Sequence, residues 1–505
     1  MKTDISHRLK ILIWNYPLVI FLLLIMLCSK QPNQIYIDGR FADWQHLTTV
    51  YKDKISDQKT GKLDFGKLWI TNDAEYLYLR IEVGTEINLQ DDNEMTLFID
   101  TDNDSNSGEK VDGVGADFIY RFGKRKGIFY PNVQQEDVQS DSITISQYSI
   151  GLVTSPTVTS DQFEIAIKRS SLPDGKSTLF HENSFQIVIK DLANGGDVLP
   201  NESGGIKYIF KNSTLGKSMP ISLKQENSKS LRIMTYNVLV DGLLKPEQYS
   251  SISKIINAVQ PQIMVFQELY NYDADTALKQ IEKIIPSTEQ QQWYSIKKGQ
   301  DVTVVSRYPI QSSTSIDGNG AFLLDLYPKF KSKLLLIGAH LPCCANNEGR
   351  QNEIDALMQF IRETKESISE IPLSENTPII ILGDCNLVGN AQQLKTLLTG
   401  DIQDTMRFGP RFSPDWDYSS FADLVPYCTN IPFAFTWYDR YSSFSPGRLD
   451  FMIYTDTMLQ PAKKFVLFTP AMPTDTLTAY SLNADDVLNA SDHLPVVADF
   501  ILKNN

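Results

Sequence analysis

The sequence contains few cysteines and few histidines, 5 of each in 505 residues. None of the cysteine spacings matches that of a zinc site, so bound zinc is not expected. The sequence also lacks an excess of basic residues, because its formal net charge is −14. A chain of this charge does not attract polyanions over long distances, although a local basic patch could still bind them.

A long apolar run lies near the N-terminus, at residues 11–28, and follows three basic residues among the first ten. This pattern is typical of an export signal or a membrane anchor. Cys28 ends the run as in a bacterial lipoprotein signal, although Leu27 stands where a small residue is usual. We assign residues 1–30 to a signal peptide or a membrane or lipid anchor. The protein is then expected to be exported and membrane-tethered, in the cell envelope or outside the cell.

The chain is too long for one typical hydrophobic core, so two domains are expected. Residues 33–225 consist of short alternating stretches separated by turn residues, which predicts a β-sandwich. In residues 76–83, for example, leucine, isoleucine or valine occupies every second position. A polar stretch at residues 223–230 is the predicted linker. Residues 231–505 then form the second domain.

Short motifs occur in the first domain at residues 37–39, 43–44, 98–104, 115–117 and 163–167. They resemble motifs of family 9 carbohydrate-binding modules and related sandwich domains. The resemblance implies a β-sandwich that could bind a glycan. Trp44 is then either a platform for a sugar ring or a residue of the core.

Three aspartates in this domain, Asp100, Asp102 and Asp104, alternate with other residues. This spacing can place several oxygen atoms around Ca²⁺. The segment is not an EF-hand loop, because Ser105 stands at the usual glycine position and Val111 stands where a glutamate would close the loop. The two interpretations are a calcium site and a solvated acidic turn.

Residues 379–386 are the most informative stretch of the second domain. Residues 379–382 are four apolar residues, three of them β-branched, which predicts a buried strand. Gly383 is expected to break the strand and allow a tight turn. Asp384 and Asn386 follow at the strand's C-terminal end, where ligands bind in α/β sheets. Taken alone, the pattern is equally that of an Asp/Asn turn.

Other predicted strands of this domain also lead into polar side chains. These strands lie at residues 231–238, 263–268, 302–307, 334–340, 448–454 and 496–501, and helices are predicted at 252–259 and 346–362. Asn237, Glu268 and His340 lie at the ends of three of them. A carboxylate buried alone is costly, so a metal ion or another cation is expected beside Glu268.

The polar motifs of this domain are Thr235-Tyr236-Asn237, Gln267-Glu268, His340-Leu341, Gly383-Asp384-Cys385-Asn386, Thr436-Trp437, Arg448-Leu449-Asp450 and Ser491-Asp492-His493-Leu494-Pro495. They occur together in the order found in the endonuclease/exonuclease/phosphatase superfamily, of which deoxyribonuclease I is a member. Residues 231–505 therefore resemble this superfamily. The resemblance implies the α/β class: a deoxyribonuclease I-like four-layer sandwich, with two mixed sheets packed together and helices outside, preceded by the β-sandwich.

The resemblance also implies residue roles in phosphodiester hydrolysis, which needs an activated water and neutralisation of phosphate charge. Glu268, with Asn237 and Asp492 nearby, would bind Mg²⁺ or Mn²⁺, since hard oxygen ligands suit these ions. Asp384 would orient or deprotonate the water. Asn386 would hold a phosphate oxygen.

Two histidines are further candidates. His493 would contact the phosphate or share the proton transfer, and Asp450 would orient its ring. Whether Asp384 or His493 is the base stays open. His340 would protonate the leaving oxygen, with Gln300 or Asp301 beside it. A histidine here is found in the deoxyribonuclease I and sphingomyelinase branches rather than among AP endonucleases.

Arg448 and Trp437 are candidate substrate contacts, with packing as an alternative for Trp437. Cys343-Cys344 follows His340 closely and could form a disulfide with Cys428. Residues 415–444 are rich in aromatic side chains, some of which belong to the core. The others could stack on bases or enter a lipid surface.

We therefore predict an exported, divalent-metal-dependent phosphodiesterase. Its substrate would be a nucleic acid or a phospholipid head group, and a glycan could bind the first domain. The alternatives are a phosphomonoesterase acting on inositol phosphates and a non-catalytic surface-binding protein. The complete set of polar motifs argues against a binding protein that has lost catalysis.

Overall fold

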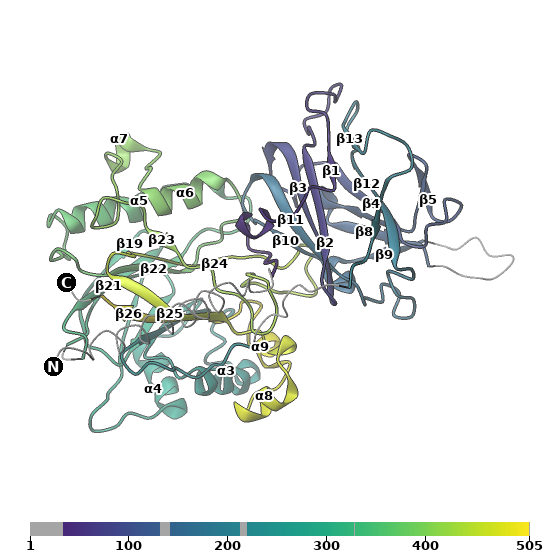
Figure 1. The fold of residues 1–505 in the computed structure, drawn as a ribbon. Coiled ribbons are helices and arrows are strands. Elements are labelled where there is room, and N and C mark those ends of the chain that lie inside the picture. Colours follow the sequence, from purple (N-terminus) through teal and green to yellow (C-terminus); the bar gives the residue numbers. More distant parts are fainter. Residues whose placement is uncertain (1–33, 132–141, 213–219, 328, 504–505) are drawn as a thin grey trace, which may run out of the picture.

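The computed structural model of the protein describes residues 34–131, 142–212, 220–327 and 329–503. The predicted signal or anchor, residues 1–30, lies outside these ranges. Within them, strands before residue 210 and strands after residue 230 belong to different sheets, and Figure 1 shows the two groups side by side. No helix of the described residues is both long and apolar enough to cross a membrane.

The N-terminal strands form two antiparallel sheets and a short ribbon. The first sheet has the order β1 (Tyr51–Lys52), β2 (Lys67–Asn72), β3 (Tyr76–Ile87), β11 (Ser160–Lys168), β10 (Val153–Ser155). The second has the order β13 (Val198–Leu199), β12 (Ser184–Asp191), β4 (Met95–Asp100), β7 (Phe118–Arg121), β8 (Lys126–Phe129), β9 (Ile143–Ile145), with β14 (Ile206–Ile209) also paired to β12. The ribbon is β5 (Glu109–Val111) with β6 (Val114–Ala116). Alternate apolar residues of β3 and β4, from both sheets, share one core. This confirms the predicted β-sandwich.

The C-terminal strands form two further sheets, each of six strands. One has the order β17 (Tyr294–Lys298), β18 (Val302–Ser306), β16 (Ile263–Gln267), β15 (Leu231–Asn237), β26 (Val496–Leu502), β25 (Leu459–Val466). The other has the order β19 (Ile310–Ile316), β20 (Asn319–Asp325), β21 (Lys333–His340), β22 (Ile379–Asp384), β24 (Asp450–Tyr454), β23 (Ala422–Asp423). Each sheet contains one parallel pair, β15 with β16 and β21 with β22. Both sheets are therefore mixed, as predicted.

Helices cover the outer faces of these two sheets (Figure 1). On one side lie α3 (Pro246–Val259), α4 (Ala274–Ile284), α8 (Thr474–Ala479) and α9 (Asp486–Ala490); on the other lie α5 (Asn347–Lys365), α6 (Ala391–Thr399) and α7 (Thr405–Phe408). Helices α3 and α5 connect the two parallel strand pairs, which is how parallel strands are usually joined. The result is the predicted four-layer α/β sandwich.

The alternation of side chains in β22 shows why its sequence is continuously apolar. Ile380 and Leu382 belong to the core between the sheets, whereas Ile379 and Ile381 pack with the residues of α5. Because both faces of the strand are covered, every position is apolar rather than every second one.

Gly383 lies within β22, which continues to Asp384, so the prediction that this glycine ends the strand is wrong. Its φ is +139°, and a Cβ atom there would lie 2.0 Å from the carbonyl oxygen of Ala339 on β21. Gly383 is therefore needed because the neighbouring strand approaches its backbone closely.

The β-sandwich and the C-terminal sheets share an apolar seam. Tyr76 packs edge-on against Phe433 at 4.9 Å between ring centres, and Tyr36 stacks on Tyr427 at 4.2 Å. The backbone N–H of Ile37 donates to the carbonyl of Pro432. Tyr427 and Phe433 of the aromatic segment 415–444 therefore pack against the sandwich.

Candidate active site

A cleft of about 950 Å³ lies where the two parallel strand pairs end. Among the residues lining it are seven of the predicted site residues: Glu268, His340, Asp384, Asn386, Trp437, Asp492 and His493. The carboxyl ends of β15 and β16 in one sheet face those of β21 and β22 in the other, as ligand sites of α/β sheets require. Residues far apart in the sequence are thereby brought together.

Asp384 lies between two histidines. Its Oδ2 atom is 3.6 Å from Nε2 of His493 and 3.7 Å from Nε2 of His340. The same oxygen accepts a hydrogen bond from Nδ2 of Asn237 at 3.1 Å. The other oxygen, Oδ1, accepts one from the backbone N–H of Asn386 at 3.1 Å. The carboxylate is buried, and these groups define its orientation.

Each histidine contacts a second carboxylate through its other ring nitrogen. Nδ1 of His493 lies 2.9 Å from Oδ2 of Asp450, as expected for an orienting partner. Nδ1 of His340 lies 2.7 Å from Oδ2 of Asp301. Of the two residues considered beside His340, Asp301 rather than Gln300 makes this contact. Both contacts leave Nε2 on the cleft side of the ring.

The neighbouring carboxylates favour the protonated form of both rings. Burial opposes the charged form of His340, but the hydrogen bond with Asp301 and the charge of Asp384 raise its pKa to about 9. Burial also opposes the charged form of His493, whose pKa is raised to about 10 by the charges of Asp450 and Asp384. Burial raises the pKa of Asp384 to about 6, although the two histidines oppose this rise. Two imidazolium groups can thus donate hydrogen bonds to a bound anion.

Asn237 connects this group to Glu268, because its Nδ2 also donates to Oε1 of Glu268 at 2.9 Å. The second oxygen of Glu268 accepts from the backbone N–H of Val240 at 2.8 Å. Asp492 accepts from Nε1 of Trp437 at 3.0 Å. Glu268 and Asp492 supply hard oxygen donors without a lysine beside them in the described cleft lining. Their chemistry fits Mg²⁺ or Mn²⁺.

Two predicted residues have other contacts. Nδ2 of Asn386 donates to the carbonyl of Leu341 at 3.0 Å, which braces the loop after His340. Arg448 is 8% exposed, hydrogen-bonds to Asp423 and stacks over Phe451, and it is not among the residues lining the cleft. The structure therefore gives Arg448 a packing role, and its position does not support the predicted substrate contact.

The family model described as "Endonuclease/Exonuclease/phosphatase family" matches residues 234–493, more than half of the chain. The chain belongs to the Endonuclease/Exonuclease/phosphatase family. No curated protein matches it. Similar solved structures include humanized D. rerio TDP2, at 15% identity over 54% of this chain and 99% of that chain, with a TM-score of 0.34. The human Nocturnin catalytic domain is 18% identical over 55% of this chain and 95% of that chain, with a TM-score of 0.33. ANGEL2, described as a 2′,3′-cyclic phosphatase, is 15% identical over 54% of this chain and 95% of that chain, with a TM-score of 0.35.

The β-sandwich contributes to the cleft of this family member, which the sequence did not indicate. Asn88, Gln90, Asp91, Arg125 and Thr157 line the cleft together with the residues of the family motifs. All of them lie outside residues 234–493, the part that the family model matches. Their local sequence carries no signal of a site, because the contact exists only once the sandwich is seated on the C-terminal sheets.

The cysteines are paired differently from the expectation. Cys343 and Cys344 are bonded to each other and line the cleft, whereas Cys385 and Cys428 are free and buried. A disulfide from Cys343 or Cys344 to Cys428 is therefore wrong. Cys428 is instead fully buried, with its Sγ near the carbonyl of Phe435.

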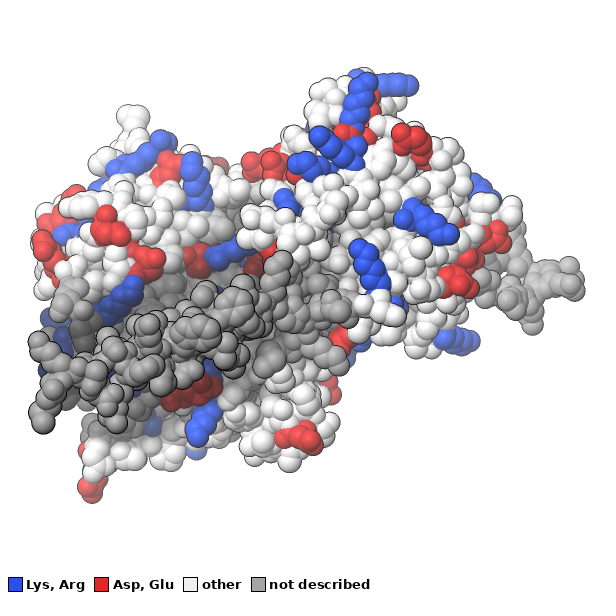
Figure 2. All heavy atoms as spheres, in the orientation of Figure 1, with Lys and Arg blue, Asp and Glu red and all other residues white. Residues whose placement is uncertain are grey.

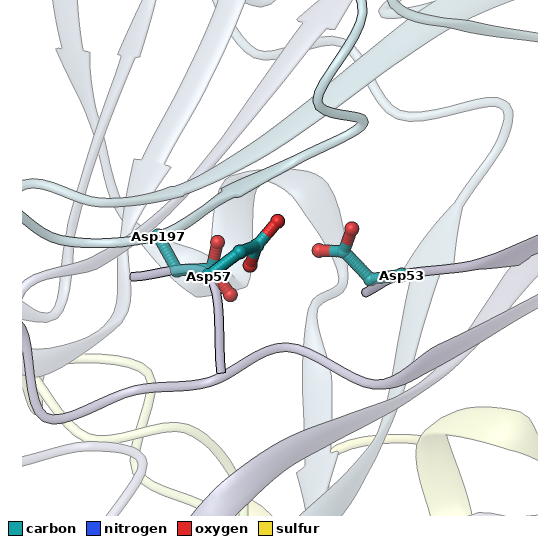
Figure 3. Close-up of side chains that lie close together, drawn as sticks. All are labelled: Asp53, Asp57 and Asp197. Atoms are coloured by element: carbon teal, nitrogen blue, oxygen red, sulfur yellow. The ribbon is translucent and has the colours of Figure 1, made fainter. Parts of the chain in front are cut away.

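Acidic groups that could hold a cation also lie in the β-sandwich. Carboxylate oxygens of Asp100, Asp102 and Asp117 lie within 4.8 Å of one another, whereas Asp104 accepts hydrogen bonds from Asn106. Asp117 thus joins the predicted pair in place of Asp104. A second group, Asp53, Asp57 and Asp197, has the same spacing and is drawn in Figure 3.

Trp44 is fully buried, and its Nε1 donates to Oε1 of Glu164 at 2.7 Å. Of the two interpretations of Trp44, the core residue is the one confirmed. It cannot present its ring to a sugar, because no face of the indole reaches solvent. Burial raises the pKa of Glu164 well above its usual range.

Proposed function

We propose that this protein is a divalent-metal-dependent phosphodiesterase. The observation that carries the proposal is the position of Asp384 between the Nε2 atoms of His340 and His493, each ring being held by its own carboxylate. Hydrolysis of a phosphodiester needs a proton acceptor for water, donors to the phosphate oxygens and a proton for the leaving oxygen. This arrangement supplies all three in one cleft.

In the proposed reaction, Asp384 takes a proton from the attacking water as a new P–O bond forms. His493 donates a hydrogen bond through Nε2 to a phosphate oxygen. His340 gives its Nε2 proton to the leaving oxygen as the other P–O bond breaks. Asp450 and Asp301 keep the two rings oriented throughout.

Glu268 and Asp492 would hold the divalent ion, with Asn237 positioned against Glu268 by its amide. A bound ion supplies positive charge that neutralises the phosphate oxygens. Without it, the carboxylates of the cleft would repel an anionic substrate, since the described lining contains six of them and one arginine. Removal of the ion should therefore abolish activity.

The substrate is a phosphodiester of a nucleic acid or a phospholipid head group. The face shown in Figure 2 carries acidic and basic side chains intermixed over the C-terminal part, and the net charge is −14. Such a distribution gives little long-range attraction for nucleic acid, so binding must rely on contacts inside the cleft.

The test is a screen of the purified protein with Mg²⁺, Mn²⁺ or EDTA against plasmid DNA, RNA, sphingomyelin liposomes and phosphorylated inositols. Asp384→Asn is the matched inactive control. Metal-dependent cleavage of a diester that this variant loses would support the proposal. Cleavage of soluble phosphomonoesters alone would favour the phosphatase alternative, and no cleavage in any arm would favour a binding protein.

We also propose that the protein is exported and held at the membrane by residues 1–30. The support is the basic and apolar N-terminal pattern that ends in Cys28. Membrane fractionation of cells expressing the wild type and Cys28→Ser tests this. Release of the variant into the soluble exported fraction would indicate a lipid anchor. Retention of both proteins would indicate an uncleaved apolar anchor, and cytoplasmic recovery of both would contradict export.

A further inference from the structure

We propose that Arg125 of the β-sandwich binds substrate in the catalytic cleft and selects phosphodiesters that carry a second phosphate near the scissile one. The proposal rests on the proposed function, because it concerns the same cleft. It gives the first domain a part in substrate choice that does not involve sugar binding.

Arg125 is the one lysine or arginine among the described residues that line the cleft. Six carboxylates line it as well: Asp91, Glu268, Asp301, Glu353, Asp384 and Asp492. A cleft with this balance disfavours a polyanion unless each phosphate finds its own compensating charge. The two histidines and the proposed metal site serve the scissile phosphate. Arg125 is then the permanent cation left for a second one.

The guanidinium of Arg125 is held in place from two sides. It lies over the ring of Phe444 at 4.3 Å from the ring centre. Nη1 donates to the carbonyl of Gln90 at 2.5 Å and lies 3.4 Å from Oδ1 of Asp91. Asp91 is 65% exposed, so solvent screens its attraction and the positive charge of Arg125 is only partly compensated. Both polar contacts use Nη1 and Nε is buried, so Nη2 is the nitrogen left to donate to an anion.

The wall that carries Arg125 is fixed to the C-terminal domain beside the cleft. Nδ2 of Asn88 donates to the carbonyl of Val388 at 3.1 Å, and Oε1 of Gln90 accepts from the backbone N–H of Ser445 at 2.7 Å. The carbonyl of Phe444, whose ring supports Arg125, accepts from Nε2 of Gln147 at 2.8 Å. A residue held this way loses little freedom on binding, as a positioned substrate contact requires.

The charge of Arg125 also favours substrates with an additional phosphate over substrates with a quaternary ammonium group. An arginine attracts phosphate through directed hydrogen bonds and repels a quaternary ammonium group. A choline head group is therefore disfavoured beside it. The favoured chemistry is a phosphodiester with an adjacent phosphate, which occurs both in oligonucleotides and in phosphorylated inositol lipids.

Two pairs of soluble probes, each differing by one phosphate, test the proposal on the full-length protein. The dinucleotide TpT is compared with pTpT, and glycerophosphoinositol with its 4-phosphate. Binding is measured calorimetrically with Mg²⁺ in proteins that also carry Asp384→Asn to prevent hydrolysis, and kcat and KM are measured with Mg²⁺ in proteins without that substitution. We expect the extra phosphate to improve binding and KM about tenfold in at least one pair, which identifies the source of the phosphate. Arg125→Gln should remove that preference by raising KM for the substrate with the extra phosphate more than it lowers kcat, and Arg125→Lys should keep part of it.

Arg121→Gln is the matched control, because Arg121 is exposed at the end of β7 and does not line the cleft. It should leave the phosphate preference intact. The proposal would be overturned if both members of each pair bound equally well when Arg125 is present. It would also be overturned if Arg125→Gln weakened the binding of both members by the same factor. A third outcome separates the two proposals. If Arg125→Gln loses the binding preference for the extra phosphate but the wild type hydrolyses none of the probes in Mg²⁺, the role of Arg125 in binding is supported and the phosphodiesterase function is refuted.

Discussion

Nδ1 of His340, at the end of β21, lies 2.7 Å from Oδ2 of Asp301, which is in the turn before β18 of the other sheet. The same carboxylate oxygen accepts the backbone N–H of Glu268 at 2.5 Å. One buried aspartate thus positions both the proposed proton donor and the segment that carries the proposed metal ligand. Replacement of Asp301 should therefore impair catalysis by displacing His340 and the segment of Glu268, and not through a contact of Asp301 with the substrate.

Asp301→Asn should lower kcat on the order of 10²-fold or more, because His340 loses the charge that holds its proton and orients its ring. Steady-state kinetics on the best diester substrate measures this. Gln300→Ala serves as the comparison, since Gln300 lines the cleft without making that contact. Similar losses for the two variants would contradict the assignment of Asp301 as the positioning residue.

Asp384→Asn and His493→Ala should each reduce kcat on the order of 10³-fold or more, because each removes a group that moves protons or stabilises charge. The double variant should be far from additive, since groups that act on one reaction step are lost together. Circular dichroism should show that both single variants and the double variant are folded, because the two replaced side chains line the cleft and are not part of the apolar core. An unchanged kcat in either single variant would refute its role.

Ca²⁺ should raise the melting temperature of the protein through the aspartates of the β-sandwich, by binding the folded state. Asp117→Asn should reduce the shift, whereas Asp104→Asn should retain it, because Asp117 and not Asp104 joins Asp100 and Asp102. Scanning calorimetry at millimolar Ca²⁺ measures both. An unchanged melting temperature in the wild type would favour the solvated acidic turn.

The calcium effect should also depend on pH. Burial and the charges of Asp117 and Asp102 raise the pKa of Asp100 to about 6, compared with about 3.9 in an unfolded chain. The folded state therefore binds this proton more tightly, and without Ca²⁺ stability should fall as pH rises from about 4 to about 6. The stabilisation by Ca²⁺ should grow over the same window. A calcium shift that is equally large at pH 4 and pH 7 would contradict this.

Alkylation of the denatured, unreduced protein should modify Cys385 and Cys428 and spare Cys343 and Cys344, since only the latter two are bonded. Mass spectrometry of the peptides reads this directly. Reduction before alkylation is the control and should expose all four thiols. A peptide that joins Cys343 or Cys344 to Cys428 would refute the pairing of neighbouring cysteines.

The sequence alone indicated strands of both domains: β15, β16, β18, β21, β22, β24 and β26 of the C-terminal sheets, but not β17, β19, β20, β23 or β25, and strands of the sandwich such as β3. Residues 379–382 predicted a strand because both faces of β22 are covered, and residues 76–83 predicted one because alternate side chains of β3 enter the core. Covered and half-covered strands leave these patterns in any chain, since burial of apolar surface drives folding. The family motifs were equally readable, because each is a short run at a strand end.

Tertiary structure decided which polar groups meet. In the folded protein, Asp301 rather than Gln300 contacts His340, and Arg448 hydrogen-bonds to Asp423. Arg125, from the sandwich, lines the cleft. The periodicity of apolar residues in a strand predicts which of its faces are buried, but it does not predict which loop packs against its end. Such contacts join residues far apart in the chain, and they depend on how the sheets and the sandwich pack together.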